Sequence, residues 1–142
     1  MKLSSKSMYA LRALLTLAIH PKGVPLPVRV LAEKNQIPIK FLEQILTQLK
    51  KSGLLISVAG PSGGYLLARG AAEITLGQVI AELDGEVALV ACLAKEAHQM
   101  CSCTNQTKCN LRVAISEVQS GLNSLLDSRS LQSVLDQGAR RG

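Results

Sequence analysis

Residues 38–68 read PIKFLEQILTQLKKSGLLISVAGPSGGYLLA, and this stretch decides the fold. Pro38 suits the first turn of a helix, because the amide hydrogen that proline lacks would have no partner there. The next apolar side chains recur at steps of three and four and predict a helix with one buried face, made of Leu42, Ile45, Leu46 and Leu49. Gly53 is well placed to end this helix.

Two short runs rich in apolar residues follow, at 54–58 and 65–68, with the Gly/Pro-rich segment 59–64 between them. Extended runs around such a turn predict a β-hairpin. Before them, residues 7–20 carry an amphipathic helical stripe that ends at Pro21, and residues 28–34 form a second helical candidate before the polar break at Asn35 and Gln36. Helix, short break, helix and hairpin is the order of a winged helix-turn-helix.

Further helices are expected after the hairpin. Thr75 and Gln78 have capping-box spacing and open a helix that Asp84-Gly85 ends. The polar segment between Cys92 and Cys109 predicts a loop. A long helix follows, and steps of four and three separate its apolar residues, Leu111, Ile115, Val118, Leu122 and Leu125. This heptad-like stripe favours packing along a partner helix over packing on its own domain.

The fold class expected is mainly α, a winged helix-turn-helix with a small β-hairpin wing and a long C-terminal dimerisation helix. We assign residues 1–84 to the DNA-binding region and 85–110 to a cysteine-rich loop, which the family resemblance given below identifies as cluster-binding. Residues 110–137 are assigned to the dimerisation helix and a last helix over 130–136 that ends at Gly138, and 138–142 to a flexible tail.

The charge is unevenly distributed along the chain. The formal net charge is +6, and residues 1–70 carry ten Lys or Arg against two acids, whereas residues 71–142 carry six against eight. A basic half indicates a polyanionic partner. Phe41, Tyr9 and Tyr65 are the only aromatic residues, too few for the stacking platforms of single-stranded sites, so duplex DNA is favoured.

The third helix is expected to read this duplex from its exposed side. We predict that Lys40, Glu43, Gln44 and Thr47 face base edges and that Lys50, Lys51 and Arg12 lie nearer phosphate. Helix-turn-helix proteins usually meet palindromic sites as dimers, so the expected complex is a homodimer on a roughly palindromic operator.

Several other classes are disfavoured. No apolar run approaches the length of a membrane span, and residues 8–19 contain Arg12 and precede no small-residue cleavage site, so a cytoplasmic protein is expected. With no Ser/His/Asp set, no phosphate-binding glycine loop and only His20 and His98, the chain is not expected to be an enzyme.

Four cysteines fall within an 18-residue segment: Cys92, Cys101, Cys103 and Cys109. In a cytoplasmic chain such a group favours metal ligation or redox chemistry over structural disulfides. Thiolates suit iron-sulfur clusters, and they suit structural zinc equally well, so both remain possible from the residues alone. A thiol oxidoreductase is disfavoured, because Cys101 and Cys103 lack Cys-x-x-Cys spacing.

The chain resembles the IscR/NsrR-type family of winged-helix iron-sulfur transcription regulators. The resemblance covers about residues 1–135 and rests on four segments: the opening MKLSSK with Tyr9-Ala10-Leu11, Leu42-Glu43-Gln44 in the third helix, the wing GPSGGY at 60–65, and the cysteine segment. It implies a homodimer with the third helix in the major groove and the wing, with Ser62 and Gly63, near the minor groove. It also implies a regulator, such as a repressor, that senses oxidation, nitric oxide or iron status.

The resemblance further implies a [2Fe-2S] or [4Fe-4S] cluster held by Cys92, Cys103 and Cys109. This sequence departs from the family at the fourth ligand, because the two usual places hold Arg112 and Met8. Arg does not release its proton to bind iron, and a thioether is a weak ligand. Cys101, His98 or an outside ligand such as water or a small thiol are the remaining candidates.

Overall fold

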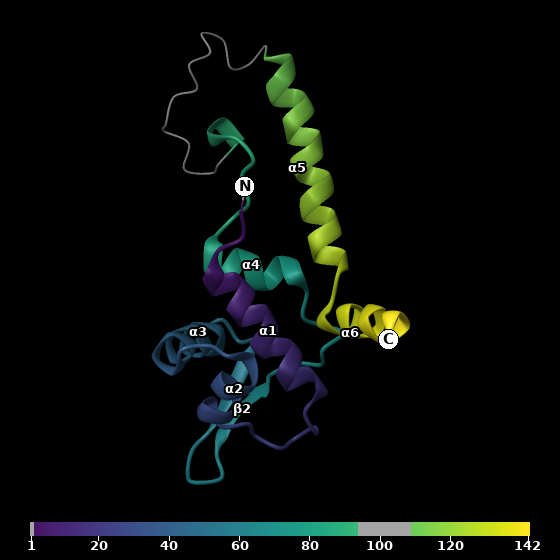
Figure 1. The fold of residues 1–142 in the computed structure, drawn as a ribbon. Helices are drawn as coiled ribbons and strands as arrows, with labels where there is room; N and C mark the ends of the chain where they lie inside the picture. Colours follow the sequence, from purple (N-terminus) through teal and green to yellow (C-terminus); the bar gives the residue numbers. More distant parts are fainter. Residues whose placement is uncertain (1, 94–108) are drawn as a thin grey trace.

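The computed structural model describes residues 2–93 and 109–142. The described residues form six α-helices, one short 3-10 helix and one two-stranded sheet. Figure 1 shows helices α1 to α4 gathered at one end of the molecule, while α5 extends away from them as a long arm. The mainly α winged-helix class predicted from the sequence is confirmed. The cysteine loop predicted between Cys92 and Cys109 lies largely outside the described residues.

The first helix, α1, runs Ser5–Ile19 and begins two residues before the predicted start. The reason is Ser4, whose Oγ accepts a hydrogen bond from the Ser7 amide at 3.0 Å and so satisfies one of the free N–H groups of the first turn. The second helix, α2, runs Val28–Asn35 and ends at Gln36, which has a φ of 54°. The helix thus continues one residue beyond its predicted end, because Asn35 still belongs to α2, and the break expected between the two helices begins at Gln36.

The third helix, α3, runs Ile39–Lys51 with Pro38 as its N-cap. Gly53 has a φ of 81°, a left-handed conformation that glycine adopts at little cost, and the Leu54 amide donates back to the Leu49 carbonyl at 3.0 Å. This end of the helix is confirmed as predicted, and it directs the chain into the hairpin.

The hairpin consists of β1 (Leu55–Val58) and β2 (Gly64–Leu67), paired antiparallel with Leu55 opposite Leu67. A one-residue bridge adds the loop before α2, because Leu26 and Tyr65 exchange backbone hydrogen bonds of 3.1 and 2.9 Å. A side chain at Gly64 would place its Cβ 2.2 Å from the Leu26 carbonyl oxygen, so this close approach requires glycine.

Helix α4 runs Leu76–Asp84 and begins with the predicted capping box. The Thr75 side chain accepts from the Gln78 amide, and the Gln78 side chain accepts from the Thr75 amide, each at 3.2 Å. Gly85, with a φ of 78°, ends the helix as expected. The chain then leads to the 3-10 helix η1 (Ala91–Leu93), which contains Cys92.

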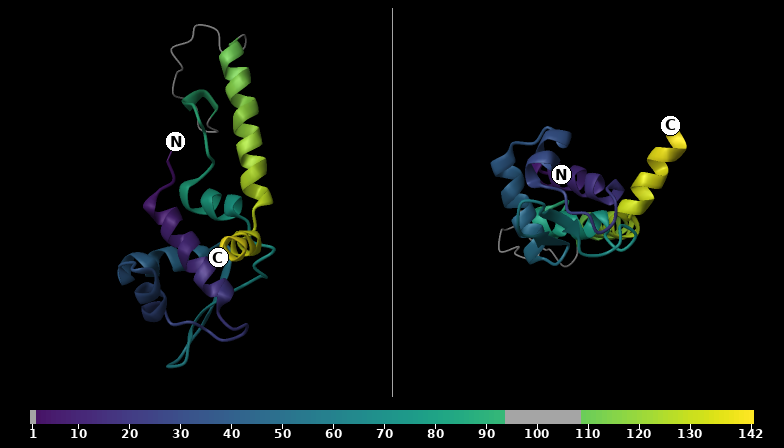
Figure 2. Two further views of the ribbon diagram at one scale, coloured as in Figure 1. Left: turned by 45° about the vertical axis from the view of Figure 1, so that its right-hand side comes forward. Right: turned by 90° about the horizontal axis from the view of Figure 1, so that it is seen from below.

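The long helix α5 runs Asn110–Ser128, and α6 follows at Leu131–Arg141. The last helix was predicted to end at Gly138, but it continues to Arg141. One glycine costs only about 1 kcal/mol in a helix, and Arg140 and Arg141 carry positive charge in the last turn, where it stabilises the helix dipole. Figure 2 shows that α6 lies at an angle to α5 and begins beside the end of the molecule formed by α1 to α4, which we call the helical end.

The core lies almost entirely at the helical end. Its buried residues come from α1 to α4, from the loops and strands between them and from the start of α6, whereas α5 contributes none. The buried core residues are Ala10, Leu11, Ala13, Leu14, Leu17, Leu26, Leu31, Ala32, Ile37, Leu42, Ile45, Leu46, Leu49, Leu54, Leu55, Ile74, Val79, Ile80 and Leu131. Within the described ranges, no helix combines the length and apolar character that crossing a membrane requires.

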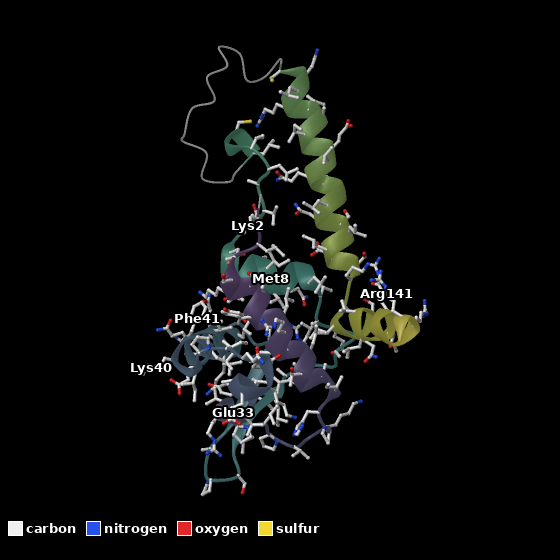
Figure 3. The ribbon with its side chains drawn as sticks, in the orientation of Figure 1. Lys2, Met8, Glu33, Lys40, Phe41 and Arg141 are labelled. Carbon is white, nitrogen blue, oxygen red and sulfur yellow. The ribbon has the colours of Figure 1, made fainter. Side chains whose placement is uncertain are left out.

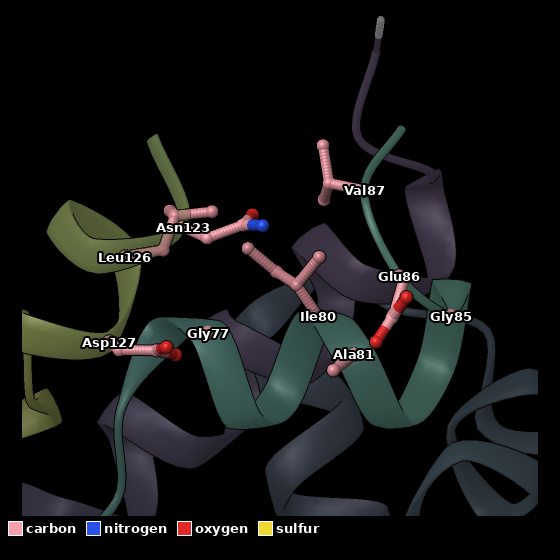
Figure 4. Close-up of a pocket in the computed structure, with 9 residues that line it drawn as sticks. All are labelled: Gly77, Ile80, Ala81, Gly85, Glu86, Val87, Asn123, Leu126 and Asp127. Atoms are coloured by element: carbon pink, nitrogen blue, oxygen red, sulfur yellow. The ribbon is translucent and has the colours of Figure 1, made fainter. Parts of the chain in front are cut away.

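The arm joins this end through α4. A cavity of about 210 Å³ lies at the junction, lined on one side by Gly77 and Ile80 of α4 and on the other by Asn123 and Leu126 of α5 (Figure 4). A Cβ at Gly77 would lie 2.0 Å from an Asp127 carboxylate oxygen and 3.2 Å from the Asp127 amide. The absence of a side chain at Gly77 therefore lets the end of α5 approach α4.

Candidate functional site

The exposed face of α3 gathers polar and charged side chains. Because the opposite face is fully buried through Leu42, Ile45, Leu46 and Leu49, helical periodicity directs the remaining positions to solvent. One open groove is lined by Lys40, Glu43, Gln44, Thr47, Gln48 and Lys51. Figure 3 labels Lys40 at the outer side of this helix, away from the arm. The structure thus brings together all four side chains predicted to read bases.

The details of this face differ from residue to residue. Lys40, Glu43 and Gln44 are exposed, while the Thr47 hydroxyl donates to the Glu43 carbonyl at 2.8 Å and keeps its oxygen available as an acceptor. Lys50 and Lys51 lie in the last turn of α3 and are also exposed. Their positive charges are favourable at a helix C-terminus and remain accessible to phosphate.

Arg12 has a structural role that the sequence did not reveal. Its Nη2 donates to the carbonyl oxygen of Asn35, at the end of α2, and its guanidinium lies 5.6 Å from the centroid of the Tyr9 ring. Tyr9 in turn makes an edge-to-face contact with Phe41, with ring centroids 5.6 Å apart. Arg12 therefore holds α1 against the turn that precedes α3, and its phosphate contact stays a prediction.

The two wing residues predicted near DNA are placed differently. Ser62 is exposed at the turn, whereas Gly63 is buried and donates its amide to the Gly60 carbonyl at 3.0 Å. A Cβ at Gly63 would lie 2.0 Å from the Val58 carbonyl oxygen, so Gly63 shapes the turn. Ser62 is consequently the better candidate for a direct contact.

Sequence reasoning missed Gln48, whose amide joins three helices. Its Oε1 accepts from Lys6 Nζ of α1 at 2.5 Å, and its Nε2 donates to the Glu82 carbonyl of α4 at 2.9 Å. These partners lie 42 and 34 positions away in the chain, so no local pattern could have found them.

The first turn of α1 is also fixed to the last turn of α4. Ser4 donates to the Asp84 carboxylate through its amide at 3.2 Å and through its hydroxyl at 2.5 Å. Asp84 is exposed overall, but the loss of water at its contact with α1 raises its pKa; the hydrogen bonds from Ser4 and the charge of Lys6 outweigh this effect, and the net result is a lowered pKa. The carboxylate is therefore stabilised in its charged form.

Two of the predicted cysteine ligands are described, and both lie where η1 meets α5. Cys92 is part of η1, and Cys109 is the N-cap of α5, where its Sγ accepts from the Arg112 amide at 3.4 Å. The Arg112 Nη2 donates to the Cys92 carbonyl at 3.5 Å. Arg112 thus contacts both cysteines, and neither cysteine is in a disulfide.

Cys92 and Cys109, the two described cysteines of the predicted site, are chemically suited to bind a metal ion or an iron-sulfur cluster. The two thiols are partly buried and unpaired, and thiolate is the preferred ligand of iron-sulfur clusters and of zinc. Residues 2–93 and 109–142 contain no group of three or more possible metal ligands. Cys101, Cys103 and His98 lie outside the described residues. Met8, on α1, is 45% exposed, which leaves its thioether accessible.

A winged helix-turn-helix with an exposed polar face on its third helix defines a DNA-binding class of protein. Residues 3–137 match the model of the Rrf2 family, described as an iron-dependent transcriptional regulator. The chain belongs to the Rrf2 family, and its relatives are named as transcriptional regulators, not enzymes.

The most similar proteins include IscR sequences and solved regulator structures. The HTH-type transcriptional regulator IscR of Aliivibrio salmonicida is 37% identical over 92% of this chain and 75% of its own length. The structure of T. potens IscR has a TM-score of 0.75 and 28% identity, covering 97% of this chain and 88% of the other. The structure of CymR, the global cysteine regulator of B. subtilis, has a TM-score of 0.78 and 26% identity, covering 96% of this chain and 98% of the CymR chain.

Proposed function

We propose that this chain regulates transcription as a homodimer that reads a palindromic duplex with α3 and senses redox, nitric oxide or iron status through a cysteine-held iron-sulfur cluster. The observation that carries DNA reading is the α3 surface, where Lys40, Glu43, Gln44 and Thr47 stand exposed on a helix whose other face is buried. A rigidly packed helix presents its side chains to a major groove without needing to reorganise.

The basic side chains around this surface are proposed to contact phosphate, and the reading residues to contact bases. Replacing Lys50 with alanine is expected to weaken binding to all duplexes alike and to reduce the slope of log affinity against log salt by about one. Gln44→Ala is expected instead to change the preference among base pairs, at a cost of about 1–3 kcal/mol. Equal behaviour of both variants on all sequences would contradict base reading by α3.

Dimerisation is proposed through α5. None of its residues is buried, and Leu111, Val118 and Leu125 of the predicted stripe are each more than half exposed, at 69%, 59% and 55%. Apolar side chains in such a row favour a second helix over water. A second copy of this chain is the proposed occupant, because the palindromic site expected for this class needs a symmetric pair.

The cluster is proposed to be held by Cys92, Cys109 and Cys103, with Cys101, His98 or an outside ligand completing it. Support comes from the two described cysteines, because Arg112 donates its amide to the Cys109 thiol and its guanidinium to the backbone carbonyl of Cys92 at the end of the arm. When bound, an iron-sulfur cluster supplies redox chemistry and reactivity toward oxidants and nitric oxide. The protein's part is to hold Cys109 by the first amides of α5 and to fix the η1 backbone through Arg112.

Anaerobic purification with a visible spectrum and with iron and sulfide analysis tests the cluster. We expect substoichiometric iron and loss of the visible band in Cys92→Ala, Cys103→Ala and Cys109→Ala. If Cys101→Ala keeps both, Cys101 is not a ligand. Bound zinc without colour, or a full cluster in any of the three single variants, would overturn the proposal while leaving DNA reading intact.

A further inference from the structure

We propose that Gln48 is a positioning residue for DNA reading: its side-chain amide fixes the orientation in which α3 presents its exposed face. This inference rests on the proposed function, because it concerns how α3 is held when it meets DNA. It rests on the contacts that Gln48 makes with α1 and α4.

Both polar atoms of the Gln48 amide are engaged. The oxygen accepts from Lys6 Nζ at 2.5 Å, and the nitrogen donates to the Glu82 carbonyl oxygen at 2.9 Å. Glu82 lies in the last turn of α4, where carbonyl groups have no donor within their own helix. Gln48 supplies such a donor from another helix, so the bond satisfies the end of α4 while holding α3.

The two helices that Gln48 contacts are also joined to each other. Ser4, at the start of α1, donates twice to the carboxylate of Asp84, at the end of α4. Lys6 and Glu82 therefore belong to segments that are already tied together. The end of α4 is a fixed support against which the Gln48 amide holds α3, and it continues through Gly85 toward Cys92.

The Gln48 hydrogen bonds add a directional restraint to the apolar packing of α3. The buried face of α3 is aliphatic, through Leu42, Ile45, Leu46 and Leu49, and hydrophobic burial has no directional preference. Hydrogen bonds weaken steeply when they are misaligned. Together with the edge-to-face contact between Tyr9 of α1 and Phe41 of α3, the Gln48 bonds resist a small rotation of α3 about its own axis, which would move every reading side chain at once.

Gln48 lines the same groove as the reading residues, so direct base reading is the competing role. A glutamine reads adenine through both its oxygen and its nitrogen. Because Lys6 and Glu82 occupy those two atoms, the geometry favours positioning. The two roles predict different results on a panel of duplexes.

The test uses the full-length chain and a duplex recovered from a random-sequence library by selection. Affinity is measured for this duplex, for each of its single-base-pair variants and for a scrambled duplex. Gln48→Met removes both contacts, Gln48→Glu keeps the Lys6 contact but cannot donate to Glu82, and Lys6→Met leaves the Glu82 bond. Gln132→Met is the matched control, since the Gln132 amide bonds Asp136 within α6, on a different helix from α3.

We expect Gln48→Met and Gln48→Glu to lower the ratio of selected to scrambled affinity by about tenfold, with weaker discrimination at several base pairs and, for Gln48→Met, an unchanged salt slope. Lys6→Met should lower the ratio by about threefold, and Gln132→Met should leave it unchanged. Taking the ratio removes the uniform effect of the charge changes in Gln48→Glu and Lys6→Met. Thermal melting of each variant confirms that it is folded.

A loss confined to one base pair would show that Gln48 reads a base, and an unchanged ratio would show that it positions nothing; either overturns the inference. If Gln48→Met does not fold, Gln48→Glu and Lys6→Met decide the outcome. Failure of the proposed function is distinct, because the wild-type chain would then prefer no duplex and Gln44→Ala would change nothing.

Discussion

The helical end and the α5 arm are built on opposite principles. The helical end and Leu131 of α6 together bury nineteen apolar residues, and this end carries the basic half of the chain, whereas α5 buries none and exposes several apolar side chains to water. The first region has a buried core of its own, while the second has an apolar surface that the described part of the chain does not cover. If the proposed dimer forms through α5, stability and assembly depend on different parts of the molecule, and mutations should separate the two effects.

The largest expected effect is a loss of stability at the helical end. Leu46 of α3 is fully buried, and Leu46→Ala should lower the free energy of unfolding by about 3 kcal/mol, because it removes transfer energy and leaves a cavity. Chemical denaturation followed by circular dichroism measures this change. Leu125→Ala, on the exposed side of α5, serves as the matched control in a chain kept below its dimer dissociation constant. Equal losses would break the contrast between the two regions.

The second effect concerns assembly. Val118→Glu places a charge in the exposed stripe of α5 and should weaken the dimer by at least about tenfold, since a charge cannot be buried unpaired at an apolar interface. Ser116→Glu adds the same charge to an exposed position outside the stripe and should leave the dimer intact. Sedimentation velocity over a concentration series compares the two. Dissociation by both variants would indicate a general charge effect and not a defined interface.

The third effect tests whether the shape of the wing turn depends on the absence of a side chain at Gly63. Gly63→Ala would bring its Cβ to 2.0 Å from the Val58 carbonyl oxygen, so the turn must shift, at a cost of about 1–3 kcal/mol in stability and with reduced DNA affinity. Gly70→Ala has open space around its Cβ and should change neither quantity. Thermal melting and duplex titration of both variants measure the effects. A normal Gly63→Ala protein would contradict the tightly packed turn.

The smallest effect is the pH dependence contributed by Asp84. Its pKa is lowered in the folded state, so the carboxylate contributes stability above its unfolded pKa and loses that contribution as the pH falls through the folded value. The side chain is exposed, so the contribution should stay below about 1 kcal/mol. Asp84→Asn should therefore flatten the acidic limb of the stability-against-pH curve, measured by denaturation between neutral and acidic pH. If the acidic limb of the Asp84→Asn curve is unchanged, the loss of stability in acid arises from groups other than Asp84.

The sequence predicted the features that depend on local chemistry. Thr75 with Gln78, Gly53 and Gly85 each mark a helix end that the structure confirms, because capping requires only residues a few positions apart. The predicted end of the last helix at Gly138 was wrong, because this glycine is tolerated inside α6, whose last turn is stabilised by arginines.

Contacts between distant segments were not predictable from the sequence. The bridge between Leu26 and Tyr65, the hydrogen bond from Arg12 to Asn35 and the two bonds of Gln48 all depend on tertiary packing. The polar face of α3 was predictable because helical periodicity follows from a single segment. The roles of the cysteines stay predictions, because Cys101, Cys103 and His98 lie outside the described residues.

The most direct test of the account is the number of chains on one selected duplex, measured together with the preference for that duplex over a scrambled one. Sedimentation of fluorescently labelled duplex with increasing full-length protein gives the number of chains, and competition with scrambled duplex gives the preference. We predict two chains per duplex and a preference of at least about 10³ at physiological salt. A single chain per duplex, or equal affinity for both sequences, would contradict a dimer that reads DNA through α3.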